Sequence, residues 1–199
     1  TEIYTLSLHD ALPISIYDLN ALAGTDTLTV NDLSGTDVVE VNVDLAATID
    51  GTVGDGEADT VIANATNGED DIDVVGAGTA VSVVGLAART NVTNSEVAND
   101  SLVINGLGGD DTITATTLPA GVVKLTIDGG AGDDTILGSQ AADTLIGGDG
   151  DDFIFGDNGN DFAFMGAGDD VFQWDPGDGN DTIEGQDGTD LYGDRKSVV

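Results

Sequence analysis

A nine-residue pattern is repeated five times in unbroken register from Gly129 to Gln173, and it constrains the fold of this chain more than any other feature. The copies read GGAGDDTIL, GSQAADTLI, GGDGDDFIF, GDNGNDFAF and MGAGDDVFQ. The sixth place is always aspartate (Asp134, Asp143, Asp152, Asp161 and Asp170), and the eighth is apolar or alanine (Ile136, Leu145, Ile154, Ala163 and Phe172). Self-similarity at a fixed short period predicts a stacked architecture, in which each repeat contacts its neighbours.

Each repeat divides into a glycine-rich turn and a short strand. Glycine at the first, second and fourth places allows positive φ and a tight turn, with no Cβ to block the backbone carbonyls. The three residues that follow, such as 135–137 or 153–155, predict a strand whose middle side chain points away from its neighbours. The eighth place is therefore expected to form the core.

Two nonapeptides, read as turn, strand, turn and strand, complete one flattened coil. Residues eighteen apart in sequence then lie above one another at a spacing of about 4.8 Å. This stacking places Asp134, Asp152 and Asp170 along one edge, and Asp143 and Asp161 along the other. After Gln173 the register slips by two residues and resumes as PGDGNDTIE and GQDGTDLYG, which puts Asp181 and Asp190 at the sixth place.

Columns of carboxylates about 5 Å apart repel one another unless a cation lies between them. A hard cation that takes six to eight oxygen ligands at about 2.3 to 2.6 Å fits between stacked turns, with carboxylates and glycine carbonyls as ligands. The alternative is that the Gly-Asp turns only connect strands and leave the aspartates solvated.

The pattern G-G-x-G-x-D-x-U-x resembles the RTX repeat of haemolysin-type calcium-binding proteins. The resemblance implies an all-β, right-handed parallel β-solenoid: a calcium β-roll of nonapeptides stacked on a less regular, β-helix-like N-terminal part. It also implies several bound Ca²⁺ ions and a secreted bacterial protein, in a family whose repeats usually precede a signal for a type I exporter. The candidate calcium ligands are the sixth-place aspartates (Asp134, Asp143, Asp152, Asp161, Asp170, Asp181, Asp190), the turn glycines (Gly130, Gly132, Gly148, Gly150, Gly159, Gly166, Gly168, Gly177, Gly179, Gly188) and, more weakly, Asp111 with Gly109.

Residues 15–128 contain a more diffuse repeat. The hexapeptides DTLTVN, DTVIAN and DSLVIN begin at Asp26, Asp59 and Asp100, at spacings of 33 and 41 residues. Each leads at the same offsets to a glycine and to Asp37, Asp70 or Asp111. Alternating β-branched runs at 38–43, 72–75, 81–84 and 122–127 predict strands, and no helical period is visible. We expect longer solenoid coils that share one core with residues 129–193; a separate β-sandwich is the alternative.

The two ends of the chain look like translated sequencing-adapter DNA. The codons CAC GAC GCT CTT CCG ATC encode residues 9–14, and their reverse complement, GAT CGG AAG AGC GTC GTG, encodes residues 194–199. We therefore expect 1–14 and 194–199 to be adapter-derived and the natural protein to continue beyond both. Residues 3–8 still alternate in a way that would allow an edge strand.

Composition excludes several classes of function. The chain has 38 acidic residues against 4 lysines and arginines, a formal net charge of −34, so its surface repels nucleic acid and anionic membranes and attracts cations. It has no cysteine, which excludes disulfides and thiolate metal sites. No apolar run of about eighteen residues predicts a membrane span. Outside the adapter-like ends there is no histidine, which together with the absence of a G-x-S-x-G motif argues against an enzyme.

Aromatic residues at the outward seventh and ninth places predict a possible contact surface. They are Phe153, Phe155, Phe162 and Phe164. Exposed aromatic clusters often mark a partner site, although the ninth place could also tuck under the next turn.

We predict a calcium-binding module that folds when it meets calcium outside the cell. The alternatives are a metal-independent structural or adhesive solenoid, a non-catalytic module of a larger secreted enzyme or toxin, and a β-helical polysaccharide lyase or hydrolase.

Overall fold

The computed structural model describes residues 3–6 and 15–194, and all regular elements in these ranges are β-strands. Sheet A contains β1 (Ile3–Leu6), β3 (Thr27–Val30), β5 (Thr60–Asn64), β9 (Ser101–Asn105), β11 (Lys124–Ala131), β13 (Thr144–Asp149), β15 (Phe162–Ala167) and β17 (Thr182–Asp187), in that spatial order. Sheet B contains, in spatial order, β2 (Ser15–Asn20), β4 (Val38–Asp44), β8 (Arg89–Thr93), β7 (Ala80–Val84), β6 (Asp71–Ala77), β10 (Thr112–Thr114), β12 (Thr135–Leu137), β14 (Phe153–Phe155), β16 (Val171–Trp174) and β18 (Leu191–Asp194).

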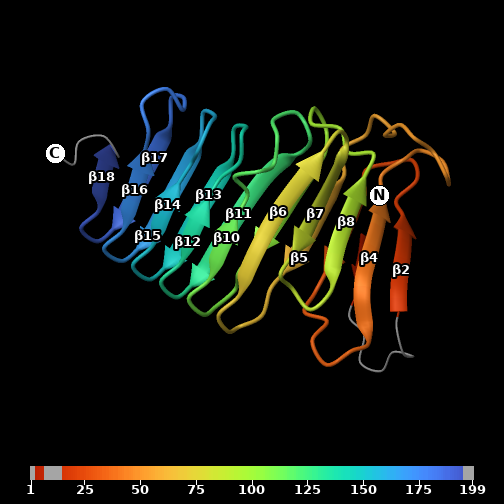
Figure 1. The fold of residues 1–199 in the computed structure, drawn as a ribbon, viewed down its shortest axis with the longest axis horizontal. Coiled ribbons are helices and arrows are strands. Elements are labelled where there is room, and N and C mark those ends of the chain that lie inside the picture. The colour runs from red at the N-terminus through yellow and green to blue at the C-terminus, as the bar shows by residue number, and fades with distance from the viewer. Residues whose placement is uncertain (1–2, 7–14, 195–199) are drawn as a thin grey trace.

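The chain passes back and forth between the two sheets, and most coils add one strand to sheet A and one to sheet B; the coil after β5 adds three strands, β6, β7 and β8, to sheet B (Figure 1). The strands lie side by side along the long axis of the molecule, with β2 near one end and β18 at the other (Figure 1). Neighbouring strands pair in parallel almost throughout. The fold is an all-β parallel solenoid, as the repeat predicted.

Strand register confirms the two-nonapeptide coil. Thr135 pairs with Phe153 and Thr144 with Phe162, both eighteen residues on. At the end of the stack the step becomes twenty, since Phe162 pairs with Thr182, and this is the two-residue slip read from the sequence. The sheet A strands are longer than expected because they continue into the first three residues of the next turn, as in β13.

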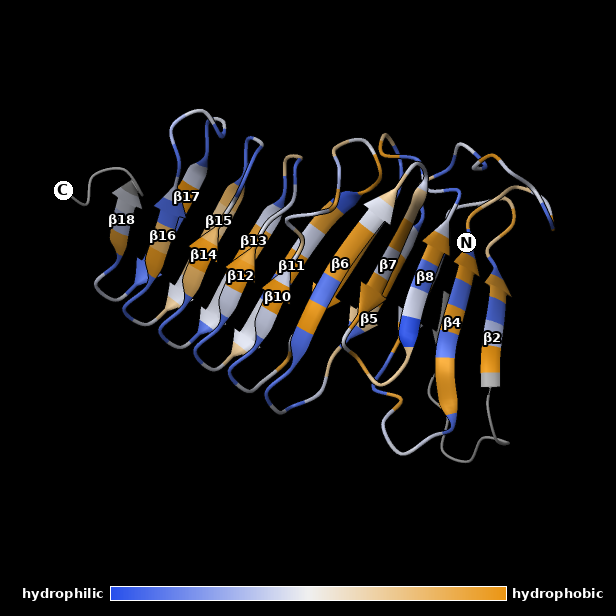
Figure 2. Ribbon diagram, in the orientation of Figure 1, coloured by the Kyte–Doolittle hydropathy of each residue, from blue (hydrophilic) through white to orange (hydrophobic). Residues whose placement is uncertain are grey.

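The eighth place forms the core, as predicted. Its five side chains are 0–1% exposed. They belong to one buried cluster that extends from Ala21 to Phe172, and hydrophobic bands recur at the same level of successive strands (Figure 2). The boundary proposed at 128/129 stays a prediction, but β11 runs across it and pairs with strands of both parts.

The first part of the chain forms wider coils. The three hexapeptides become β3, β5 and β9, which pair in register, so that spacings of 33 and 41 residues both bring equivalent residues together. Side-chain amides also form a ladder, with Asn64 Nδ2 donating to Asn31 Oδ1 at 2.8 Å and Asn105 Nδ2 to Asn64 Oδ1 at 2.7 Å.

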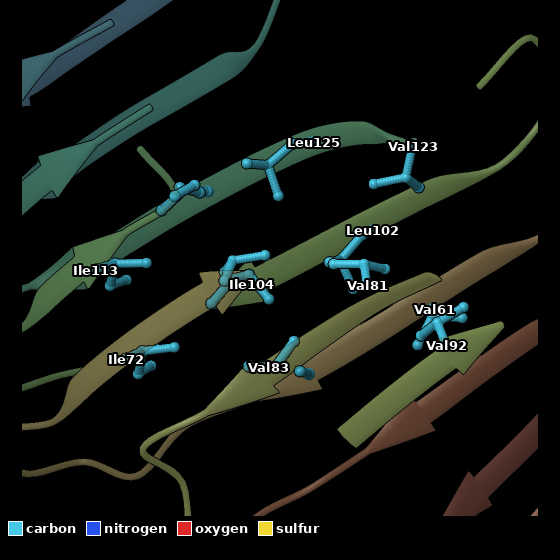
Figure 3. Close-up of a cluster of buried hydrophobic side chains, with 14 of the residues drawn as sticks. Val61, Ile72, Val81, Val83, Val92, Leu102, Ile104, Ile113, Val123 and Leu125 are labelled. Carbon is cyan, nitrogen blue, oxygen red and sulfur yellow. The ribbon is translucent and has the colours of Figure 1, made fainter. Parts of the chain in front are cut away.

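The 41-residue spacing between β5 and β9 leaves room for an additional, antiparallel strand in sheet B. β7 lies antiparallel between β6 and β8, joined to β6 by a two-residue turn at Gly78 (φ 67) and Thr79. Short turns of this kind favour hairpins because positive φ matches the twist of the strands. Val81 and Val83 of the hairpin point into the same buried cluster as Leu102 and Ile104 of β9 (Figure 3).

Residues 3–6, within the adapter-like N-terminal segment, pair in parallel with Thr27–Val30 as an edge strand. The rest of the two adapter-like segments, 1–2, 7–14 and 195–199, lies outside the described residues. In the described part of the chain, no helix has the length and apolarity needed to cross a bilayer.

Candidate metal centre

The turns of the stack take the backbone conformation that the glycine pattern predicted. Gly148 has φ 119 and Gly150 has φ 137, at the second and fourth places of one repeat. The same region of φ is adopted by Gly109, Gly130, Gly132, Gly159, Gly166, Gly168, Gly177 and Gly188. Asp157 (φ 62) and Gln186 (φ 66) adopt it without being glycine, whereas Gly179 does not adopt it.

Successive turns pack backbone against backbone. A Cβ on Gly150 would overlap the carbonyl oxygen of Gly132 in the preceding coil, and one on Gly168 would overlap that of Gly150. The fourth-place N–H completes the stack, since Gly150 donates to the carbonyl of Ala167 at 2.8 Å. Glycine is therefore required here for close approach as well as for φ.

The sixth-place aspartates form a hydrogen-bonded ladder from coil to coil. Asp134 Oδ1 accepts the N–H of Asp111 at 2.7 Å, and Asp152 Oδ1 accepts that of Asp134 at 2.8 Å. The ladder continues to Asp170 (2.8 Å) and Asp190 (3.3 Å). The opposite edge is built the same way from Asp143, Asp161 and Asp181, at 2.9 and 3.1 Å.

The second oxygen of most of these carboxylates is buried without a partner. The residues are 0–2% exposed, and their Oδ2 atoms accept no hydrogen bond: Asp111, Asp134, Asp152, Asp161 and Asp170. A buried, ionised and unpaired oxygen is costly unless a cation compensates it. The buried, unpartnered Oδ2 atoms are therefore suited to bind a metal ion.

A second, exposed ladder was missed by the sequence reasoning. The fifth-place residues bond in the opposite direction: Asp133 N–H donates to Asp110 Oδ1 at 3.0 Å, and Asp151 N–H to Asp133 Oδ1 at 2.9 Å. Each gap between coils on this edge is thus spanned by one fifth-place and one sixth-place carboxylate. The repeated Asp-Asp of GGAGDD, GGDGDD and MGAGDD was the signal that could have revealed it.

Among the described residues, no group of three His, Cys, Asp or Glu side chains converges as a metal cluster. A cation between these turns would therefore draw most of its ligands from backbone carbonyls. Calcium accepts such a mixture of carboxylate and carbonyl oxygens in a flexible shell. The donor set present fits calcium.

Comparison with known families agrees with this geometry. The family described as the RTX calcium-binding nonapeptide repeat matches in four copies, at residues 103–116, 126–145, 137–172 and 177–192. The chain carries RTX calcium-binding repeats. Searches of curated proteins and of solved structures found no significant match.

The first matched RTX copy includes Asp111, the weaker candidate. Of the related turns before it, Asp70 donates its N–H to Asp111 Oδ1 at 2.8 Å, but its own Oδ2 is engaged by the N–H and hydroxyl of Thr66 at 2.9 and 2.7 Å. Asp37 is exposed. The structure thus brings Asp111 into the ladder and leaves Asp37 outside it.

Asp143 differs from the other RTX aspartates. Both of its oxygens are engaged within its own turn, Oδ2 by the N–H of Ser139 at 2.6 Å and Oδ1 by its hydroxyl at 2.8 Å. Ser139 replaces the second glycine of the repeat in GSQAAD. Because Ser139 donates hydrogen bonds to both carboxylate oxygens of Asp143, we expect Asp143 to bind a cation more weakly than Asp152.

Burial in the RTX stack raises the carboxyl pKa values when no metal is bound. The pKa of Asp152 and of Asp161 is raised to about 7, first by desolvation and then by neighbouring carboxylates. Burial likewise raises the pKa of Asp111 and of Asp143 to about 6. Proton uptake and cation binding are therefore competing ways of compensating the same charges.

These pKa shifts predict opposite pH dependences with and without calcium. In EDTA, the folded form binds more protons than the unfolded form between about pH 4 and pH 7, so its stability should rise as pH falls through that window. In saturating calcium, acid displaces the ion and stability should fall. Urea unfolding followed by circular dichroism from pH 7.5 to 4.5 measures both slopes. The same dependence of stability on pH in EDTA and in calcium would contradict the assignment of these carboxylates as calcium ligands.

The four phenylalanines do not form one surface. Phe153 and Phe155 lie on β14 in sheet B, where Phe155 pairs with Leu137 and Phe153 with Val171. Phe162 and Phe164 lie on β15 in sheet A, and Phe162 is 52% exposed. The four phenylalanines therefore form two separate pairs, one on each sheet, and cannot contact one partner as a single patch.

Proposed function

We propose that this chain is a calcium-dependent folding module of a secreted bacterial protein and has no catalytic role of its own. The observation that carries the proposal is the set of buried Oδ2 atoms without partners in the RTX ladder. At submicromolar calcium the carboxylates repel one another and the coils are loosely held. Millimolar calcium outside the cell exceeds the dissociation constants of ~10⁻⁴ to 10⁻³ M expected of extracellular sites, and therefore drives folding by mass action.

The ligands in this proposal are the sixth-place aspartates with carbonyl oxygens of the glycine turns. Asp134, Asp152, Asp161 and Asp170 combine an unpartnered oxygen with nearly complete burial. Asp181 and Asp190 extend the two columns but are only partly buried. The aromatic pairs on β14 and β15 would be the contact points for a protein partner or surface.

A titration of the full chain with calcium and then with magnesium tests the proposal. Calcium should raise the β-sheet signal in circular dichroism and the melting temperature cooperatively, because carbonyl-rich turns suit its flexible coordination. Magnesium should largely fail because it requires a strict octahedron and retains its waters. An unchanged spectrum with calcium would instead favour a metal-independent structural solenoid.

A further inference from the structure

A second aspartate ladder of the same kind precedes the RTX repeats, at the start of strands of sheet A. Asp26, Asp59 and Asp100 immediately precede β3, β5 and β9, at the place that Asp143 and Asp161 take before β13 and β15. Asp59 Oδ1 accepts the N–H of Asp26 at 2.8 Å, and Asp100 Oδ1 accepts that of Asp59 at 3.1 Å. This ladder precedes residue 103, where the first match to the repeat family begins.

The turn before Asp26 also has the backbone of an RTX turn. Leu22 has φ 61 and Gly24 has φ 127, four and two residues before the aspartate. Gly148 and Gly150 stand at the same offsets before Asp152 and are also in positive φ. A leucine rarely adopts this conformation, so the turn is held there by its surroundings and not by residue preference.

Two carboxylates from the next coil are fixed against this one turn. Asp55 Oδ2 accepts the N–H of Gly24 at 2.9 Å, and Asp59 Oδ1 accepts that of Asp26 at 2.8 Å. In the RTX stack the fourth-place N–H goes to a backbone carbonyl, as Gly150 does with Ala167. Here a carboxylate takes that role and brings a further negative charge into the gap.

One oxygen of the Asp59 carboxylate has no hydrogen-bond partner among the described residues. Asp59 is 1% exposed, and its Oδ2 is buried and accepts no hydrogen bond. Oδ1 of the same carboxylate is bonded to the turn that begins near Ala21, so the Asp59 carboxylate lies where the two coils meet. Asp134, Asp152, Asp161 and Asp170 show the same combination of a hydrogen-bonded Oδ1 and an unpartnered Oδ2.

An exposed lysine ammonium lies beside the ladder beyond Asp100, two gaps from the Asp26–Asp59 gap. Val123 stands where the column would have another aspartate, and the ammonium of Lys124 donates to the carbonyls of Ala98 at 2.8 Å and Asn99 at 3.2 Å. These carbonyls belong to the loop that leads to Asp100. A protein cation thus binds carbonyl oxygens beside this ladder, one coil from Asp59.

We propose that a calcium ion binds between the turns of residues 21–26 and 54–59, with the carboxylate of Asp59 and backbone carbonyls as its ligands. Asp55 contributes a neighbouring negative charge, since both of its oxygens accept backbone N–H groups, from Gly24 at 2.9 Å and from Glu57 at 2.8 Å. The donor set is all oxygen, which selects a hard cation, and the irregular turns suit the flexible shell of calcium better than the octahedron of magnesium. The site is separate from the RTX repeats and would close the wide coils at the N-terminal end of the stack.

Calorimetric stoichiometry on the full chain tests this site. Asp59→Asn keeps an oxygen acceptor for the N–H of Asp26 but removes the charge, and should reduce the number of bound calcium ions by one. Glu57→Gln is the matched control, since Glu57 is exposed in the same turn, and should leave the number unchanged. Asp55→Asn removes a neighbouring charge and should weaken calcium binding at this site, and the double variant should still lose one ion in total.

Asp152→Asn separates this site from the RTX sites. It should lower the stoichiometry independently of Asp59→Asn, so that the two losses add. A wild-type stoichiometry in Asp59→Asn, with a loss in Asp152→Asn, would overturn the additional site and leave the RTX function intact. The reverse pattern would support the additional site and contradict the RTX ligands. If Asp59→Asn does not fold by circular dichroism, the calcium affinity of Asp55→Asn decides: a weakened site relative to Glu57→Gln supports the proposal, and an unchanged affinity overturns it.

Discussion

Replacing Asp152 with alanine is expected to remove about two calcium ions and to destabilise the calcium-bound protein more than any other single aspartate change. Its Oδ1 is bonded to the preceding coil, through the N–H of Asp134. Its Oδ2 lies beside Gly147, which also approaches the carbonyl oxygen of Met165 in the following coil. One carboxylate can therefore serve the gaps on both sides. Each lost site should cost about 2.7 kcal/mol at a calcium concentration about 100-fold above its dissociation constant.

Asp143→Ala provides the comparison for this prediction. Its carboxylate is committed to Ser139, so the variant should lose one weak ion or none. The free energy of unfolding in EDTA should still fall, because the N–H and hydroxyl of Ser139 lose their acceptor. Calorimetric stoichiometry and urea unfolding, with and without calcium, distinguish the two variants. Equal ion losses would mean that each turn binds independently and that ligand pairs across coils are wrongly assigned.

Gly150→Ala is expected to destabilise the protein strongly, because the backbones of successive coils are in close contact at this residue. A Cβ at this position would overlap the carbonyl of Gly132, and the residue would also have to hold φ 137. Positive φ costs a non-glycine residue roughly 1 to 2 kcal/mol. Overpacking typically adds about 1 to 3 kcal/mol. The expected loss of stability in calcium is thus roughly 2 to 5 kcal/mol, measured by urea unfolding.

Gly177→Ala isolates the conformational part of that cost. Gly177 has φ 110, but a Cβ there would meet no atom within 4 Å. This variant should therefore lose only the roughly 1 to 2 kcal/mol of the φ term and keep the calcium affinity of the turns around Asp152. If both variants lost the same stability, close backbone stacking would not be the reason for glycine at the fourth place.

Periodicity was sufficient to place the RTX coil because each repeat contacts only its neighbours. Position in the nine-residue pattern predicted which side chain is buried, from Ile136 to Phe172, and which residues lie eighteen apart in register. The two-residue slip after Gln173 was equally local, and the strands resumed pairing where the sequence placed them. Calcium binding followed from the same repeat through its resemblance to a known family.

The wide coils of residues 15–128 were predicted less completely. The hexapeptides at Asp26, Asp59 and Asp100 identified the strands that stack, because the aspartate and asparagine ladders require equivalent residues in register. The antiparallel hairpin of β6 and β7 was not foreseen. Alternating runs of β-branched residues predict strands but not their direction, which depends on the space left between β4 and β10.

The repeat, the coil, the buried positions and the columns of aspartate follow from the residue pattern alone, since all of these depend on local chain geometry and a fixed period. The hydrogen bonds of each carboxylate depend on contacts between turns and coils in the folded protein. The missing glycines of GSQAAD already predict that Asp143 is a weaker ligand than Asp152. The contacts come from the structure: Asp143 is engaged by Ser139, and Asp152 has a buried oxygen without a partner. The neighbours that make this difference come from turns and adjacent coils, and the resulting hydrogen bonds depend on atomic positions that the pattern of residue types does not specify.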